Sequence, residues 1–448
     1  RIVNFNCHSE IRETRPHNYV YNEYTPVIVE TRDNKLRIIS LPRASALYPG
    51  SFVSESLMSS ILTRRFQMAL PLNRLEKEYH SRGVPLSRQT MSNWIIHFAL
   101  EIFAPIRERM WQELDQGGLV RQCDETTWRV VIWPEDEDGN KKKNGSRGYL
   151  WVHTTGEFTQ GHKILIYVFE PSRSADHLRI MLKEMAGYLV SDAYSAYHTI
   201  ENESGGRIKA AMCWMHCRRM FARAVMVMEP GLDELDAEEL KNSPEVTGLL
   251  LANQIFEADT PLKKLDSDER YRKRKEKVAP LVEEFFGYVH SVEDEDFERS
   301  PKLQEAVTYA INQEDNLKLF LENGSIPLDN GYVERSIKPV ALARRNSLFS
   351  YTMLGAECNA IMYSIVETAR ANGADVYTYL KYLLSEVPKH LDGKDRHFLD
   401  DMMPWSMQYL QFERYELEHH TDEYVPKSQE SPKEYLQRFR SGKSNDVA

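Results

Sequence analysis

The stretch from Leu119 to Ile132 reads Leu-Val-Arg-Gln-Cys-Asp-Glu-Thr-Thr-Trp-Arg-Val-Val-Ile and predicts a long β-strand. Successive side chains of a strand point to opposite faces, which places Asp124 on the face of Trp128 and Glu125 on the other face. A carboxylate in such a strand needs a positive partner when it is buried. We interpret Asp124 as a candidate metal ligand, with an ordinary ion pair as the alternative.

The residues that follow alternate between strand and helix patterns. Further strands are predicted over residues 148–155, 163–169, 187–191 and 207–214, with helices over 172–185 and 193–198. In a sheet with the order βββαβαβ, the first and fourth strands are neighbours, so Asp124 and Asp192 would converge. This is the ribonuclease-H-like arrangement. The alternative role for Asp192 is an N-cap of the short helix.

A third carboxylate, Glu334, lies within a predicted helix at residues 326–349. Asp329 or Asn330 can accept a hydrogen bond from the free amides of its first turn. Steps of four residues place Asn330, Glu334 and Lys338 on one face. An ordinary solvated helix is the alternative, but the two aspartates upstream favour a functional role for Glu334.

Pro339 is expected to end or kink this helix near Lys338. The basic residues around Glu334 are Arg335, Lys338, Arg344 and Arg345. We expect them to hold DNA backbone phosphates, contacts that position a duplex without reading its sequence.

Two buried carboxylates at neighbouring strand positions are costly unless a cation lies between them. Mg²⁺ or Mn²⁺ is the expected cofactor, because hard cations prefer carboxylate oxygens. With Glu334 as the third ligand, Asp124, Asp192 and Glu334 would form a catalytic site for two ions, one at the attacking and one at the leaving oxygen.

The sequence predicts an α+β multidomain chain. Its ribonuclease-H-like mixed-sheet core would carry a helical insertion and follow a small N-terminal β module and a helix-turn-helix region. The expected divisions are a β module at 1–52, a helical DNA-binding region at 53–117, the first part of the core at 118–215, a helical insertion at 216–325, the catalytic helix and core completion at 326–372, and a helical C-terminal domain and tail at 373–448.

A helix, a turn containing Gly83 and a second helix beginning near Ser87 fit a helix-turn-helix. The second helix would present polar side chains to base edges, namely Arg88, Gln89, Ser92 and Asn93. An ordinary pair of antiparallel helices explains the pattern equally well.

Composition bounds the function classes. The 448 residues carry a net charge of −10, which alone disfavours nucleic acid as a partner. However, residues 1–100 hold 13 Lys or Arg against 8 Asp or Glu, and Tyr271–Lys277 is a further basic cluster. No apolar run approaches the length of a membrane span. Because the sequence begins with Arg1, we expect that an upstream portion is missing.

The 5 cysteines are few and scattered, which indicates a reducing compartment. Cys213, His216 and Cys217 have a spacing that zinc sites use, but no fourth ligand is apparent nearby, and packing or helix-start roles are favoured. His216, Arg218 and Arg219 could instead face substrate phosphates.

Five motifs occur in the order Cys123-Asp-Glu-Thr, Tyr149-Leu-Trp-Val, Leu189-Val-Ser-Asp-Ala-Tyr-Ser-Ala-Tyr, Cys213-Trp-Met-His-Cys-Arg-Arg-Met-Phe and Asn330-Gly-Tyr-Val-Glu-Arg-Ser-Ile-Lys-Pro. With Tyr363-Ser-Ile-Val-Glu-Thr-Ala-Arg, this sequence resembles the DDE transposases of the insertion sequence 66 family from about Pro49 to about Trp405.

The resemblance implies that Asp124, Asp192 and Glu334 match the family's DDE triad. It also implies an upstream helix-turn-helix region and a short C-terminal domain. Two departures stand out. The Cys-rich segment that is common near the family's N-terminus is represented only by Cys7, and Ser347 stands where the family often has Trp.

We therefore expect a Mg²⁺-dependent transposase that cuts DNA at insertion-sequence ends and joins the freed 3′-hydroxyl to target DNA. Its expected partners are double-stranded DNA and, on DNA, further copies of itself, with no membrane. Its expected location is the bacterial cytoplasm, at the nucleoid. The alternatives are a catalytically inactive DNA-binding protein on the same fold and a nuclease without strand transfer. The expected DNA contacts are Asn330, Arg335, Lys338, Arg344, Arg345, His216, Arg218, Arg219, Arg88, Gln89, Ser92 and Asn93.

Overall fold

The computed structural model divides the chain into two compact units, which are treated separately below. One comprises Arg1–Ile95 with Gly373–Ala448, and the other comprises Ile96–Asn372. The six divisions expected from the sequence are finer and stay predictions. The structure describes residues 2–14, 17–32, 35–40, 47–48, 50–135, 139–140, 143, 145–228, 236–391 and 396–418.

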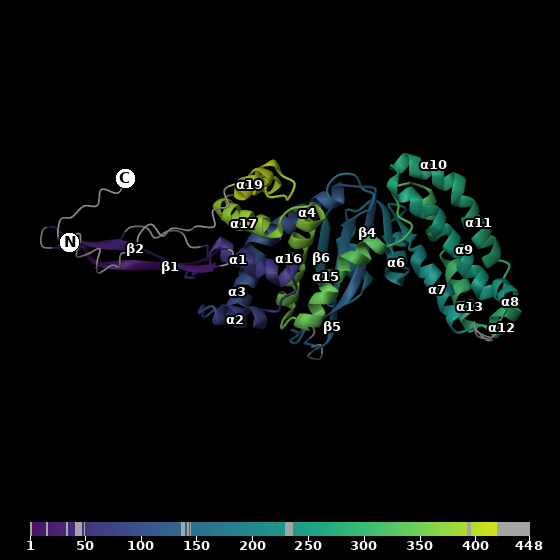
Figure 1. Cartoon of the computed structure of the whole chain (residues 1–448), viewed down its shortest axis with the longest axis horizontal. Helices are drawn as coiled ribbons and strands as arrows, with labels where there is room; N and C mark the ends of the chain where they lie inside the picture. Colours follow the sequence, from purple (N-terminus) through teal and green to yellow (C-terminus); the bar gives the residue numbers. More distant parts are fainter. Residues whose placement is uncertain are drawn as a thin grey trace. The chain divides into compact units, whose positions relative to one another are not determined.

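A five-stranded mixed sheet organises the unit Ile96–Asn372 (Figure 1). Its strands are β4 (Val120–Arg129), β5 (Arg147–Thr155), β6 (Leu165–Glu170), β7 (Gly187–Ser191) and β8 (Ile208–Met212), and their spatial order is β6-β5-β4-β7-β8. Strand β5 is antiparallel to β4 and β6, whereas β7 is parallel to β4 and to β8. The predicted adjacency of the first and fourth strands is confirmed, and the sheet is consistent with a ribonuclease-H-like core.

The register of β4 against β7 fixes where the two aspartates lie. Gln122 pairs with Val190, and each aspartate follows its paired residue by two positions. Parallel strands keep a constant register, so Asp124 and Asp192 leave the paired segment at the same level. Backbone pairing alone therefore brings them to one edge of the sheet.

Helices account for most of the rest of this unit. They are α4 (Ala104–Gln116), α5 (Ala175–Met181), α6 (Ser195–Glu203), α7 (Trp214–Met226), α8 (Ala237–Asn242), α9 (Pro244–Asp259), α10 (Ser267–Lys277), α11 (Ala279–Val289), α12 (Asp294–Arg299), α13 (Pro301–Asn312), α14 (Glu314–Lys318), α15 (Gly331–Ser347) and α16 (Met353–Ala371). Helix α15 packs on β4 and β5, and α16 packs on β6. No helix among the described residues combines the length and apolarity that a membrane span requires.

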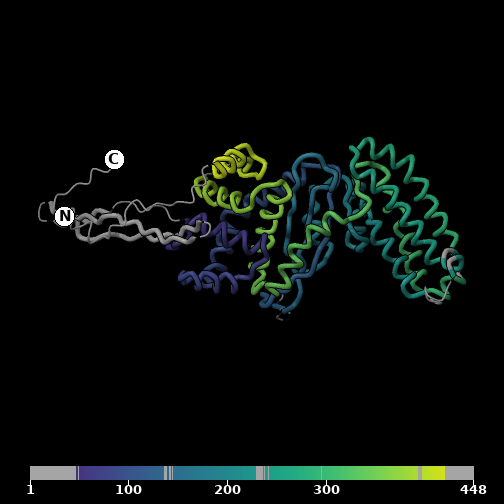
Figure 2. The backbone as a smooth tube through the Cα atoms, viewed as in Figure 1, coloured from purple at the N-terminus to yellow at the C-terminus, as the bar shows by residue number. Residues whose placement is uncertain are grey.

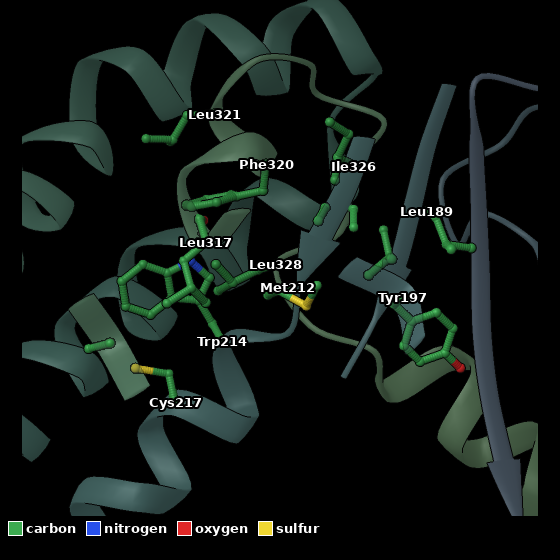
Figure 3. Packing of buried hydrophobic residues seen from close by; sticks show 14 of the residues in the cluster. Leu189, Tyr197, Met212, Trp214, Cys217, Leu317, Phe320, Leu321, Ile326 and Leu328 are labelled. Carbon is green, nitrogen blue, oxygen red and sulfur yellow. Dashed lines mark hydrogen bonds between the residues drawn. The ribbon is translucent and has the colours of Figure 1, made fainter. Parts of the chain in front are cut away.

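Trp214, the first residue of α7, lies in the hydrophobic core of the helical block from α7 to α14, near Cys217, Leu317, Phe320 and Leu328 (Figure 3). Its indole ring contacts three phenylalanines edge-on, Phe285, Phe286 and Phe320. Its Nε1–H donates to the carbonyl of Leu317 at 2.8 Å, and its backbone N–H donates to Leu328 O at 3.1 Å. One residue therefore holds together the helical block and the segment that leads back to the sheet, a return that Figure 2 traces from the teal helices to the green α15.

Helix α15 runs unbroken through Pro339. The predicted end of the helix near Lys338 is therefore wrong. A proline inside a helix costs about 3 kcal/mol through one lost hydrogen bond and a clash. The helix buries Val333, Val340 and Ala343 on one side, and this packing outweighs the local cost.

The other unit contains an antiparallel sheet and helices. The strands are β1 (Ile2–Thr14), β2 (His17–Arg32) and β3 (Lys35–Ser40). The helices are α1 (Glu55–Leu62), α2 (Leu72–Ser81), α3 (Arg88–Phe98, which continues into the sheet-containing unit), α17 (Val376–Glu386), α18 (Phe398–Asp401) and α19 (Met407–Glu418). The two predicted helices around the Gly83 turn are confirmed as α2 and α3, and Gly83 has a φ of +79°.

A buried ion pair braces the helical block. Arg274 of α10 donates to both carboxylate oxygens of Asp259, at 2.6 and 3.1 Å, and to the carbonyls of Phe320 and Ile326, and both charged side chains are 0% exposed. Although Arg274 belongs to the basic cluster Tyr271–Lys277, it is therefore not available to a phosphate.

We predict that Arg274→Met lowers the free energy of unfolding by about 3–5 kcal/mol, because Asp259 would remain buried without its partner. Urea unfolding followed by circular dichroism measures this change. Lys302→Met is the matched control, since the Lys302–Glu305 pair is about half exposed on both sides. Equal effects of the two substitutions would contradict the prediction.

Candidate active site

Asp124 is half-buried near the middle of β4 and faces other negative charges. Its Oδ1 accepts a hydrogen bond from the backbone N–H of Glu125 at 2.8 Å. Burial raises the pKa of Asp124 to about 7, the carboxylates of Glu125, Asp192 and Glu334 add to this rise, and the N–H of Glu125 opposes it. The three predicted carboxylates, from β4, the end of β7 and α15, thus act on one another electrostatically.

Asp192 directly follows β7 and is held by two groups. Its Oδ1 accepts the N–H of Tyr194 at 3.1 Å, and its Oδ2 lies 3.6 Å from Arg173 Nη2. The N-cap residue of α6 is Tyr194, so the alternative reading of Asp192 as the N-cap is wrong. The bond to Tyr194 fixes the direction of the carboxylate instead.

Glu334 lies in the first turn of α15 and is half-buried. Its backbone N–H donates to Asn330 O at 3.1 Å. The ligating atoms of Glu334, His216 and Cys213 all lie within 4.8 Å of one another. The residues that begin α7 and α15 therefore meet at this carboxylate.

Sequence reasoning missed Glu125 and Arg173 as parts of this site. Glu125 forms an ion pair with Arg173 and accepts the Tyr197 hydroxyl at 3.0 Å. The Arg173 guanidinium lies 3.8 Å from the ring centroid of Tyr194, whose hydroxyl donates to Arg173 O at 2.7 Å. Burial is the largest cause that raises the pKa of Glu125. Arg173 lies in the loop after β6. No local sequence pattern indicated its role, because its partners Glu125 and Asp192 belong to two other segments of the chain.

The donor chemistry of the three carboxylates fits a hard divalent cation. Oxygen ligands from Asp and Glu are those that Mg²⁺ and Mn²⁺ prefer. Burial, and to a smaller extent the neighbouring carboxylates, raise the pKa of Asp124, and a bound cation would favour its ionised form. Asp124, Asp192 and Glu334 are the residues that would hold it.

The basic residues of α15 do not share one environment. Lys338 and Arg345 are exposed, and Arg335 is 55% exposed beside Glu157, with an Nη2–Oε1 distance of 3.1 Å. Arg344 is instead half-buried and donates to the carbonyl and the hydroxyl of Thr127. The expectation that Arg344 holds phosphates is therefore corrected: it fastens α15 to β4.

Asn330 is also corrected as a DNA contact, because its side chain is 0% exposed. Its Nδ2–H donates to Cys123 O at 3.0 Å, and its Oδ1 accepts Gln122 Nε2–H at 3.2 Å. The side chain makes no cap bond, and Asp329 Oδ1 accepts the Gly331 N–H at 2.8 Å. Asn330 thus ties the start of α15 to the strand that carries Asp124.

The start of α7 carries the remaining predicted contacts. Arg219 is exposed and His216 is half-buried, whereas Arg218 donates to Asn253 Oδ1 and is occupied within the fold. Burial and the charge of Arg219 lower the pKa of His216. Cys217 packs into the hydrophobic core and Cys213 is the N-cap residue of α7, which agrees with the packing and helix-start roles that the sequence favours over zinc binding. Among the described residues, the group that could hold a metal beside Cys213 and His216 includes Glu334 and not Cys217.

The thiol of Cys213 is buried next to backbone amides. Asn330 N–H donates to its sulfur at 3.2 Å. Burial raises the pKa of Cys213 to about 12, and the N–H groups of Asn330 and His216 act in the opposite direction.

In the unit Arg1–Ile95, the predicted base-reading residues begin α3. Arg88, Gln89 and Asn93 are exposed and Ser92 is half-buried. Gln89 Nε2–H donates to Asn93 Oδ1 at 2.9 Å, one turn away. These side chains are accessible on one helix, and their role in reading DNA stays a prediction.

The pKa of Asp124 predicts a pH-dependent stability change for Asp124→Asn in metal-free protein. A raised pKa means that this carboxyl's contribution to stability is complete below its unfolded pKa of 3.8 and is lost as the pH rises through about 7. Asparagine does not titrate, so the free energy of unfolding of the variant should increase relative to that of the wild type as the pH rises, by up to about 4 kcal/mol at about pH 8.

Urea unfolding with a chelator at about pH 5 and about pH 8 should show about 3 kcal/mol of this gain, since the rest accrues between the unfolded pKa of 3.8 and pH 5. Adding Mg²⁺ at the higher pH should stabilise the wild type and shrink the difference, since the cation favours the ionised carboxylate. A difference that is independent of pH would contradict the electrostatic coupling of the three acids.

Comparison with known proteins places the chain in a family. The Transposase IS66 family matches residues 50–358, and the IS66 C-terminal element matches residues 364–405. In Sinorhizobium fredii, Uncharacterized protein y4qI is 26% identical over 362 residues, which are 79% of this chain and 62% of that protein. Uncharacterized protein y4jD, from the same organism, is 24% identical over 377 residues, 82% of this chain and 69% of that protein.

Among solved structures, the Drosophila P element transposase strand transfer complex matches with a TM-score of 0.43 and 11% identity, over 75% of this chain and 94% of that chain. This likeness is below the level at which a shared fold can be argued. The family match includes Asp124, Asp192 and Glu334 and covers more than half of the sequence. The chain belongs to the Transposase IS66 family.

Proposed function

We propose that this chain is a DDE-type DNA transposase that cleaves DNA at insertion-sequence ends and transfers the freed strand to target DNA, with Mg²⁺ or Mn²⁺ as cofactor. The observation that carries the proposal is the parallel β4–β7 register that brings Asp124 and Asp192 together, with Glu334 of α15 near enough to add to the raised pKa of Asp124. Because the chain spans 62% of the relative y4qI, the activity of a whole family protein is part of the proposal.

The three carboxylates would hold the cation, which when bound would activate the attacking oxygen and stabilise the leaving oxygen at phosphorus. The chain's own groups keep the carboxylates in place. Tyr194 N–H and Arg173 direct Asp192, while burial keeps the local dielectric low and strengthens each interaction. Positioning and charge stabilisation are sufficient for phosphoryl transfer, so no dedicated base is required.

DNA backbone phosphates would be held by exposed cations that flank the site. Lys338 and Arg345 of α15 and Arg219 of α7 are exposed and lie on the two helices whose first turns meet at Glu334. Arg335 would have to leave Glu157 to reach DNA. Recognition of the ends is assigned to the polar face of α3. Joining two DNA ends requires at least a dimer on DNA.

We predict that Asp192→Asn and Glu334→Gln each lower Mg²⁺-dependent cleavage of an end-containing duplex by about 10³-fold or more, because each removes a charge at the reacting phosphate. DNA binding in the absence of cleavage should persist. Cleavage assays and electrophoretic mobility shifts measure the two properties.

Glu322→Gln is the matched control, since Glu322 pairs with Lys209 outside the site. Undiminished cleavage by either site variant would overturn the triad. Cleavage by the wild type without joining to target DNA would identify a nuclease, and metal-independent binding without any nicking would identify an inactive DNA-binding protein.

For the phosphate contacts, we predict that Lys338→Ala and Arg345→Ala weaken binding to all duplexes alike and each reduce the slope of log K against log salt by about 1. Fluorescence anisotropy at several salt concentrations measures the slope. Lys302→Ala, an exposed lysine in α13, should leave the slope unchanged. Loss of discrimination between end and random duplex would contradict a phosphate role.

A further inference from the structure

Three different donor types meet where α7 and α15 begin. A thiol, an imidazole and a carboxylate, from Cys213, His216 and Glu334, have their ligating atoms within 4.8 Å of one another. This set differs in kind from the all-oxygen set of Asp124 and Asp192. Sulfur and nitrogen donors suit borderline cations such as Zn²⁺ and Co²⁺ rather than Mg²⁺.

Backbone hydrogen bonds hold this group together. Cys213 N–H donates to Ser191 O at 3.1 Å, which extends the pairing of β7 with β8 by one residue. His216 N–H donates to Cys213 O at 3.1 Å at the start of α7. Asn330 donates its N–H to the Cys213 sulfur and accepts the N–H of Glu334. Each donor therefore comes from rigid backbone.

The imidazole has an unmet hydrogen-bonding need. Its Nδ1 is buried and has no hydrogen-bond partner among the described residues. A buried polar atom without a partner costs about 1–3 kcal/mol. A bound cation would satisfy one ring nitrogen, and a metal-ligating imidazole usually donates its other ring N–H to a further partner.

A backbone N–H points directly at the sulfur of Cys213. The Asn330 N–H that points at it, at 3.2 Å, would stabilise a thiolate, and N–H donors of this kind support metal-bound sulfur as outer partners. Zn²⁺ takes sulfur at about 2.3 Å and nitrogen at about 2.1 Å, which sets ligand atoms about 3.6 Å apart in a tetrahedron. Rotation of the half-buried His216 and Glu334 side chains can close the remaining gap.

We propose that Cys213, His216 and Glu334 bind a borderline divalent cation of the Zn²⁺ class, with a fourth position open. Where the proposed transposase activity holds, Glu334 is shared with the carboxylate site, so Zn²⁺ at this position withdraws Glu334 and inhibits Mg²⁺-dependent cleavage. The binding part of the proposal does not depend on that activity.

The test is a Co²⁺ titration of the full chain followed by absorption spectroscopy. The wild type should show a saturable thiolate-to-Co²⁺ charge-transfer band with one ion per chain, and added Zn²⁺ should abolish it. Cys213→Ala should lose the band. His216→Gln should weaken Co²⁺ binding by at least about 100-fold, because loss of even an outer partner of a ligand costs about 10- to 100-fold.

Cys217→Ala and Asp124→Asn are the controls. Cys217 has the zinc-like spacing but packs in the core, and Asp124 belongs only to the carboxylate site, so both variants should keep the band. Circular dichroism checks that each variant is folded, and His216→Gln keeps a polar side chain at a half-buried position.

A wild type without the band, or a band that Cys213→Ala keeps, would overturn the site. Unchanged Co²⁺ affinity in His216→Gln would overturn it as well. Failure of DNA cleavage with the band intact would count against the proposed transposase activity alone, which separates the two proposals.

Discussion

Like-charge repulsion at the end of the β4–β7 pair is the constraint around which the sheet-containing unit is arranged. Parallel register brings Asp124 and Asp192 to one level, and burial makes the negative charge of Asp124 costly. Arg173 offsets part of this cost, because its guanidinium forms ion pairs with both Glu125 and Asp192. The remaining negative charge is unfavourable without a counter-ion, and a bound divalent cation would offset it.

Much of the remaining structure positions Glu334 near the end of the β4–β7 pair. The chain leaves β8, passes through the α7–α14 block and re-enters the sheet region at α15. Trp214 and Arg274 bond to the carbonyls of the segment just before α15, and Asn330 bonds to β4. Packing in the helical block is therefore coupled to the position of a carboxylate far from it in sequence.

Glu334 is a point of contact between two donor sets. On one side are the aspartates of the sheet, whose oxygens suit hard cations, and on the other are His216 and Cys213, whose nitrogen and sulfur suit softer ones. One carboxylate cannot serve both fully at the same time. With both proposed metal sites occupied in turn, metal identity would govern which ligands Glu334 joins, in a way that a triad of carboxylates alone would not provide.

The sequence by itself determined the order of strands and helices, because periodicity and spacing are local properties, and it predicted the three carboxylates whose catalytic role is proposed here. It failed at Pro339, where packing of α15 outweighs a local helix-breaking preference. Sequence patterns also could not show that Arg344 is half-buried whereas Arg345 is exposed, or that Asn330 is buried. Only tertiary structure decided these, since burial and partners such as Arg173 come from segments whose proximity no local pattern encodes.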